Sequence, residues 1–152
     1  IFEGATINTV SMLCIEDAID AMEWGMKLGG LKAMRARADA NFKVLNDWVA
    51  RAPWVDFLAR NPAERSNTSV CLVISDPDIT ALDADKQAAF AKAIVSRLDK
   101  AGVAYDIGGY RDAPTGLRIW AGSTVEASDL ERLTPWLDYA FAAEKAALKQ
   151  AA

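Results

Sequence analysis

The chain has 152 residues, of which 52% are hydrophobic and 25% are charged. This balance is typical of one globular domain and excludes a disordered tail, and no apolar run approaches the ~18 residues that a membrane-spanning helix needs. With 17 basic and 21 acidic residues the net charge is −4. Nucleic-acid-binding proteins carry a basic excess, so we expect neither nucleic acid nor a membrane as a partner.

The first half of the chain predicts two helices. Apolar residues three or four positions apart predict one helix from Val10 or Ser11 to the pair Gly29-Gly30, where glycine allows the chain to turn. The same spacing predicts a second helix over 31–52, which Pro53 ends. The stripe on the inner face of the first helix consists of Met12, Ile15, Ile19, Met22 and Met26.

The second half predicts strands and two more helices. Residues 69–75 form a nearly continuous β-favouring run, typical of a buried strand, and part of 54–66 can pair as a short strand. Asp83 is the expected cap of a helix that ends before Gly102. The remaining predicted elements are a strand over 103–107, a glycine-rich loop over 108–116, a strand over 117–121 and a helix over 127–149 that contains Pro135.

This order, α-α-β-α-β-β-α, predicts a two-layer α/β (α+β) fold. We expect a small mixed sheet of about three to four strands, with helices on one face only. A helix joins the strands 69–75 and 103–107, so these two should be parallel with a right-handed crossover. The strand 117–121 can fill the gap between them, antiparallel to both, and the second face of the sheet then lacks a partner.

Two arginines are candidates for binding an anion. Side chains alternate along a strand, so Arg118 and Trp120 share the face opposite Leu117 and Ile119. A guanidinium fits a carboxylate through two parallel hydrogen bonds, and a hairpin would bring Arg111 within the length of a small dianion. The alternative is that Arg111 lies in water and Arg118 extends beside Trp120 to reach solvent.

A second candidate lies before the first helix. Backbone N–H groups at a helix N-terminus attract phosphate, and Asn8 and Thr9 add side-chain donors there. Simple capping of the helix by Thr9 or Ser11 is the alternative.

The residue types in the chain limit its chemistry. The absence of histidine excludes a Ser-His-Asp or Cys-His site and a histidine-ligated metal built from this chain alone. The two cysteines, Cys14 and Cys71, lie in apolar stretches, which favours buried thiols in a reducing compartment. No lysine lies in an apolar setting that would lower its pKa. We therefore expect an anion-binding module with no catalytic residue and no metal of its own.

Three segments together resemble a known family. Residues 7–12, 65–72 and 105–122 are similar, in order, to the C-terminal part of phosphoserine aminotransferases of the alphaproteobacterial kind. The resemblance extends over essentially the whole chain. It implies that residues 1–152 are the C-terminal small domain of such an enzyme, with the large cofactor-binding domain upstream and outside this sequence.

The resemblance also implies an activity. These enzymes are homodimers of the fold-type I class and use pyridoxal phosphate to convert 3-phosphohydroxypyruvate and glutamate into phosphoserine and 2-oxoglutarate, in cytoplasmic serine biosynthesis. The lysine that forms the Schiff base with the cofactor belongs to the large domain. We therefore expect this chain alone to be inactive and to bind no cofactor.

Site residues follow from the same resemblance. Asn8 and Thr9 would reach the cofactor phosphate of the neighbouring subunit, Arg118 would hold the substrate α-carboxylate, and Arg111 would bind the substrate's phosphate or distal carboxylate. The chain departs from the family pattern at Val10, where relatives often have proline, and at Tyr110, where many have histidine. The loop between the two arginines is also slightly longer.

Two other interpretations stay open from the sequence. One is another fold-type I aminotransferase or desulfurase that acts on a different substrate. The other is a non-catalytic ligand-binding module with a ferredoxin-like sheet.

Overall fold

The computed structural model describes residues 8–110 and 112–150 and has an α+β fold, as predicted. The described residues up to Ala36 form one compact unit and those from Arg37 onward form a second, and each unit is described by itself. The elements are α1 (Met12–Lys27), α2 (Gly30–Val49), β1 (Val55–Phe57), η1 (Pro62–Glu64), β2 (Ser69–Ile74), α3 (Pro77–Thr80), α4 (Ala84–Lys100), β3 (Leu117–Trp120) and α5 (Ala127–Gln150).

Capping residues explain where the predicted helices begin and end. The Ser11 hydroxyl accepts from the Cys14 N–H at the start of α1, and the Asp83 carboxylate accepts from the Lys86 N–H at the start of α4. Gly29 separates α1 from α2 with a φ of 111°, and Gly102 follows α4 with a φ of 68°. The four long helices predicted from spacing are confirmed.

Among the described residues, no helix combines the length and the apolar composition needed to cross a membrane.

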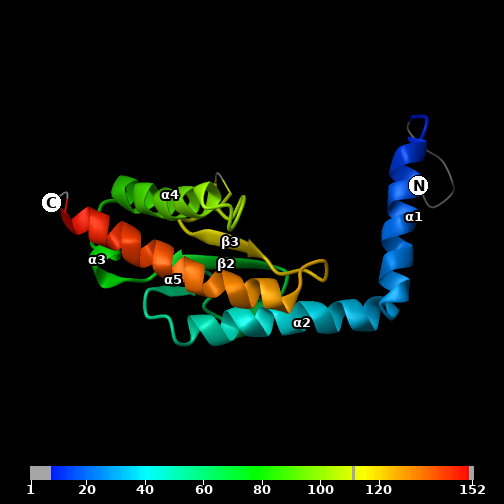
Figure 1. Cartoon of the computed structure of the whole chain (residues 1–152), viewed down its shortest axis with the longest axis horizontal. Helices are drawn as coiled ribbons and strands as arrows, with labels where there is room; N and C mark the ends of the chain where they lie inside the picture. The colour runs from blue at the N-terminus through cyan, green and yellow to red at the C-terminus, as the bar shows by residue number, and fades with distance from the viewer. Residues whose placement is uncertain (1–7, 111, 151–152) are drawn as a thin grey trace. The chain divides into compact units, whose positions relative to one another are not determined.

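The sheet has the order β1-β2-β3, and both pairs of neighbours are antiparallel (Figure 1). In the central register Val70 lies opposite Ile119 and Leu72 lies opposite Leu117. The predicted parallel pair with a helical crossover is therefore wrong. The third strand of the sheet is β1, which pairs with the far edge of β2.

Residues 103–107 do not form the predicted strand. The N–H groups of Val103 and Ala104 donate to the Leu98 carbonyl and so complete the end of α4 instead of a sheet ladder. Asp106 then adopts a left-handed conformation with a φ of 53°, which interrupts an extended run. One isolated bridge, between Gly108 and Leu117, joins the end of this segment to β3. As expected, β3 therefore lies between β2 and this segment, but the two pair at this one position instead of along a strand.

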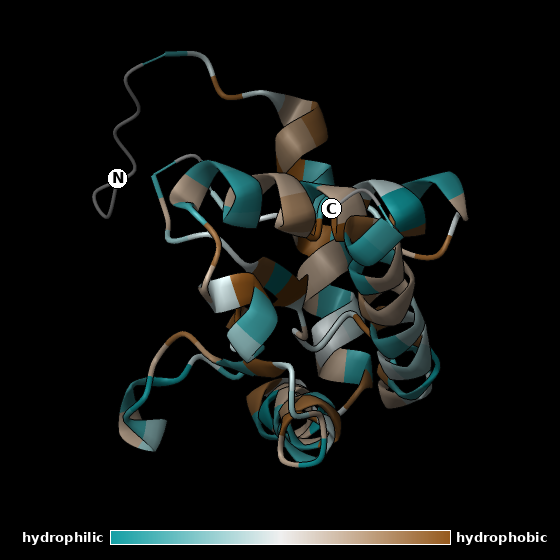
Figure 2. Ribbon diagram, turned by 90° about the vertical axis from the view of Figure 1, so that its left-hand side faces the viewer, coloured by the Kyte–Doolittle hydropathy of each residue, from teal (hydrophilic) through white to brown (hydrophobic). Residues whose placement is uncertain are grey.

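One face of the sheet carries the core of the second unit. The inward side chains of the strands pack with α4, α5 and the part of α2 from Arg37 onward. In Figure 1, α5 crosses the sheet between α4 and α2. Figure 2 shows hydrophilic and hydrophobic segments alternating along several of the helices, as expected of helices with one apolar side. The opposite face of the sheet, called the open face below, lies away from this core and carries Asp56, Ser69, Cys71, Arg118 and Trp120; Asp56 and Trp120 are exposed there and the other three are half-buried.

In the first unit, α1 confirms the predicted helix but exposes its apolar stripe. Met12, Met22 and Met26 are exposed, as are Ile15 and Ile19. Cys14 is exposed as well, so the expectation of a buried thiol is wrong there, because Gly25 is the only buried residue of this helix. Cys71, in β2, is half-buried.

Pro135 lies inside α5, where it cannot donate to the Glu131 carbonyl. The Thr134 hydroxyl donates to that carbonyl instead, at 3.3 Å. The Thr134 hydroxyl thus replaces the backbone hydrogen bond that the proline cannot make, and the helix continues past Pro135.

A buried amide joins α2 to the turn between β3 and α5. The Asn41 Nδ2 donates to the carbonyls of Ala121, Gly122 and Val125, at 3.1, 3.0 and 2.9 Å. Asn41 is almost completely buried, and the carbonyls of Ala121 and Val125 depend on its amide for a donor, whereas the Gly122 carbonyl also accepts from the Val125 N–H.

An ionic cluster joins α5 to the start of α3. The Lys145 Nζ lies 2.7 Å from Asp76 Oδ2 and 2.9 Å from Asp78 Oδ2. The hydrogen bond with Asp76, followed by that with Asp78, raises the pKa of Lys145, and the hydrogen bond from Lys145 lowers the pKa of Asp78.

We predict that Asn41→Ala lowers the free energy of unfolding by about 1–3 kcal/mol, the cost of leaving buried carbonyls without a donor. Denaturant unfolding measures this change. Asn46→Ala, in the half-buried part of the same helix, is the matched control and should have a smaller effect. Equal effects of the two variants would contradict the role of the Asn41 amide.

The ionic cluster predicts a pH dependence of stability. The lowered pKa of Asp78 means that its contribution is present above the ordinary value of 3.8 and is lost as the pH falls through the folded value. The raised pKa of Lys145 means that its contribution is present below 10.5 and is lost as the pH rises through the folded value. Lys145→Met should therefore lower the stability between these limits, and the difference in stability from the wild type should shrink at both extremes of pH.

Melting temperatures from pH 2 to 12 test this expectation. Lys92→Met, on the exposed side of α4, removes one charge without touching the cluster and is the control. A Lys145→Met protein with the wild-type pH profile would disprove the role of the cluster.

Candidate functional site

Arg118 lies on the open face of the sheet, as its position in β3 predicts. Leu117 and Ile119 are buried on the core face, and the Arg118 side chain, 19% exposed, lies on the other face opposite Cys71 of β2. Trp120 shares that face and is exposed. The alternation of the strand therefore brings a largely covered guanidinium to the face of the sheet opposite the core.

The guanidinium has two partners, both from the loop between α4 and β3. Its Nη2 donates to Asp106 Oδ2 at 3.2 Å, and its Nη1 donates to the Tyr110 hydroxyl at 3.2 Å. The Tyr110 ring also lies under the charge, with Cζ of Arg118 4.2 Å from the ring centroid. These contacts hold the plane of the guanidinium.

The Nε atom of Arg118 is buried and has no hydrogen-bond partner. A buried donor without an acceptor costs about 1–3 kcal/mol, so an acceptor that reaches it is favoured. Nε and Nη2 lie on one edge of the guanidinium, which is an edge that a carboxylate binds through two parallel hydrogen bonds. The donor pair on this edge therefore has the chemistry that a carboxylate needs, and Nε itself is closed to solvent in this structure.

Local backbone contacts fix the position of the loop. The Arg118 N–H donates to the Ile107 carbonyl at 2.8 Å, and a side chain at Gly116 would clash with the Leu72 carbonyl of β2. The end of the loop is therefore held against the sheet, next to Arg118.

The roles of the other predicted site residues, Asn8, Thr9 and Arg111, stay predictions. Asn8 and Thr9 are exposed and precede the cap of α1 in the first unit, whereas Arg118 belongs to the second. Arg111 lies outside the described residues, so its role stays a prediction. Asp106 was missed as a site residue: it lies 12 positions from Arg118, and no local spacing connects the two.

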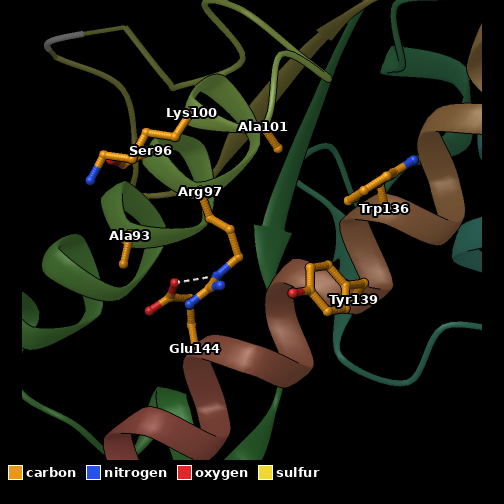
Figure 3. Close-up of a pocket in the computed structure, with 8 residues that line it drawn as sticks. All are labelled: Ala93, Ser96, Arg97, Lys100, Ala101, Trp136, Tyr139 and Glu144. Carbon is orange, nitrogen blue, oxygen red and sulfur yellow. Dashed lines mark hydrogen bonds and ion pairs between the residues drawn. The ribbon is translucent and has the colours of Figure 1, made fainter.

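A second arginine shows the contrast. Arg97 lines a groove of about 520 Å³ between α4 and α5, together with Lys100, Trp136 and Tyr139 (Figure 3). Its Nε donates to Glu144 at 2.7 Å, and this hydrogen bond raises the pKa of Arg97. The charge of Arg97 is already paired with a half-buried carboxylate, whereas Arg118 keeps a buried donor free for an acceptor.

The described lysines and acidic residues offer no obvious reaction centre. Lys145 is held by two carboxylates that raise its pKa, so it stays protonated and is unsuited to attack a carbonyl. Within residues 8–110 and 112–150, no group of three or more Cys, Asp or Glu side chains could hold a metal ion.

Comparison with known proteins confirms the resemblance to phosphoserine aminotransferases. The chain is 45% identical over 141 residues to the phosphoserine aminotransferase of Methanosarcina barkeri and 44% identical to that of Methanosarcina mazei. Each match covers 93% of this chain and 35% of the relative, so the chain spans about a third of the length of these relatives. No protein-family model matches the chain. The alphaproteobacterial kind stays a prediction.

Solved structures share the fold at low sequence identity. A phosphoserine aminotransferase from Bacillus circulans subsp. alkalophilus matches 90% of this chain and 34% of its own with a TM-score of 0.74 and 15% identity. A pyridoxal-phosphate-bound phosphoserine aminotransferase from Trichomonas vaginalis matches 90% of this chain and 35% of its own with a TM-score of 0.72 and 20% identity. The arrangement of elements described above therefore occurs within larger chains.

Proposed function

We propose that this chain is the C-terminal part of a phosphoserine aminotransferase, which transfers an amino group from glutamate to 3-phosphohydroxypyruvate in serine biosynthesis. The observation that carries the proposal is the Arg118 guanidinium, held on an open sheet face with a buried, unpartnered Nε. The identity of 45% with a relative of that name, over nearly the whole chain, supports it.

Arg118 would bind the α-carboxylate, the group that both substrates share. A planar fork binds a carboxylate at two points and so sets its direction as well as its position. The stacked Tyr110 ring keeps the fork in one plane, and the substrate gains orientation without having to order a flexible side chain. Arg111 would bind the group that differs between the substrates, the phosphate of one or the distal carboxylate of the other.

The residues before α1 fit the phosphate of pyridoxal phosphate. Asn8 and Thr9 are exposed, uncharged donors just before a helix N-terminus, which is a setting that favours phosphate. When bound, the cofactor supplies an electron sink for the carbon that loses its proton. The lysine that holds the cofactor would come from another part of the longer protein.

The same proposal includes the assembly. Asn8 and Thr9 would contact the cofactor of a neighbouring subunit in a cytoplasmic homodimer, so each site would contain residues of both chains. An exposed position for both side chains is compatible with this role.

Arg118→Lys in the full-length enzyme should lower kcat/KM for glutamate and for the keto acid by about 10–100-fold, because a point charge replaces a bidentate fork. Steady-state kinetics with both substrates measure the change. Arg97→Lys is the matched control, since Arg97 is paired with Glu144 away from the open face, and it should leave kcat/KM nearly unchanged. Normal kinetics for Arg118→Lys would remove Arg118 from the site.

This chain by itself should show neither transamination nor the absorbance of a lysine-bound pyridoxal phosphate. Spectra with added cofactor and an assay with glutamate as donor measure both properties. The full-length protein should show both, and a preference for phosphoserine over alanine and aspartate as donors would separate the proposed activity from that of another aminotransferase. Turnover by the isolated chain would contradict the proposal.

A further inference from the structure

Asp106 places a carboxylate on Arg118, the group that is proposed to bind the carboxylate of the substrate. Its carboxylate accepts from Nη2 at 3.2 Å, on the edge of the guanidinium that also carries the unpartnered Nε. Only one of the two donors on that edge is therefore used. A carboxylate free to lie parallel to the edge would use both donors.

The two partners of the ion pair differ in how firmly they are held. The Arg118 side chain is 19% exposed and stacks on Tyr110, whereas the Asp106 side chain is 91% exposed. An exposed carboxylate keeps most of its hydration, so releasing it into water costs little. The arginine can stay in place while the aspartate leaves.

The backbone of Asp106 is also unusual. With a φ of 53°, it is the only described non-glycine residue in the left-handed region. Such strain is often concentrated at functional positions, and aspartate and asparagine tolerate it better than most side chains. The conformation directs the Asp106 carboxylate back toward Arg118 from 12 residues away in the sequence.

We propose that Asp106 is an internal carboxylate that occupies Arg118 in the absence of substrate and is displaced by the substrate carboxylate. Tyr110 has the other role: it stays on Nη1 and on the face of the guanidinium and keeps the fork in position. Asp106 thereby lowers the affinity of the site for every carboxylate that uses Arg118. This inference rests on the proposed function of Arg118.

Asp106→Asn tests the proposal in the full-length holoenzyme, because it removes the charge and suits the left-handed backbone. Glutarate is the probe, since it carries two carboxylates and no amino group and so reports binding without reaction. Calorimetry should give a dissociation constant about two- to fivefold lower than that of the wild type, the effect expected of an exposed ion pair. The KM for glutamate should fall as well.

Two further variants make the result decisive. Asp106→Gly also tolerates the backbone and should show the same gain, whereas Asp112→Asn removes an equal charge from the same loop and should change the affinity less. Unchanged or weaker binding in Asp106→Asn, or an equal gain in Asp112→Asn, would overturn the proposal. If neither wild type nor Asp106→Asn binds glutarate and Arg118→Lys leaves the kinetics unchanged, the proposed function itself fails.

Discussion

Antiparallel pairing of β2 with β3 decides where the charge of the candidate site lies. Leu117 and Ile119 face Leu72 and Val70 in register and fill the core, so the residue between them must point to the opposite face. A shift by one residue would bury the Arg118 guanidinium and expose two large apolar side chains. The hydrophobic core therefore holds the arginine in place, although the arginine itself contributes little to that core.

The loop between α4 and β3 completes the site. It supplies both partners of the guanidinium, Asp106 and Tyr110, and its end is joined to the sheet by the backbone bond between Arg118 and Ile107. In a chain with a net charge of −4, an anion must find a local cluster of donors, because the field of the whole protein opposes it. The same loop thus positions the positive group and partly neutralises it.

Much of this arrangement follows from local patterns. Spacing of three and four and the caps at Ser11 and Asp83 predict the helices, because the interactions that form a helix lie within one turn. Alternation along β3 predicts the face of Arg118, because successive side chains of a strand point to opposite faces. The exposed stripe of α1 shows the limit of this reasoning, because a pattern identifies an apolar face but not what it contacts.

The amino-acid sequence by itself determined the helices, the strand that carries Arg118 and the one-sided sheet. Only the tertiary structure decided that β1 and not residues 103–107 completes the sheet, and that Asp106 meets Arg118. Strand partners and ion pairs of this kind join residues that are distant in the sequence, and their choice depends on how the whole chain packs. The left-handed turn at Asp106 belongs to this second group, since its neighbours alone favour an extended strand.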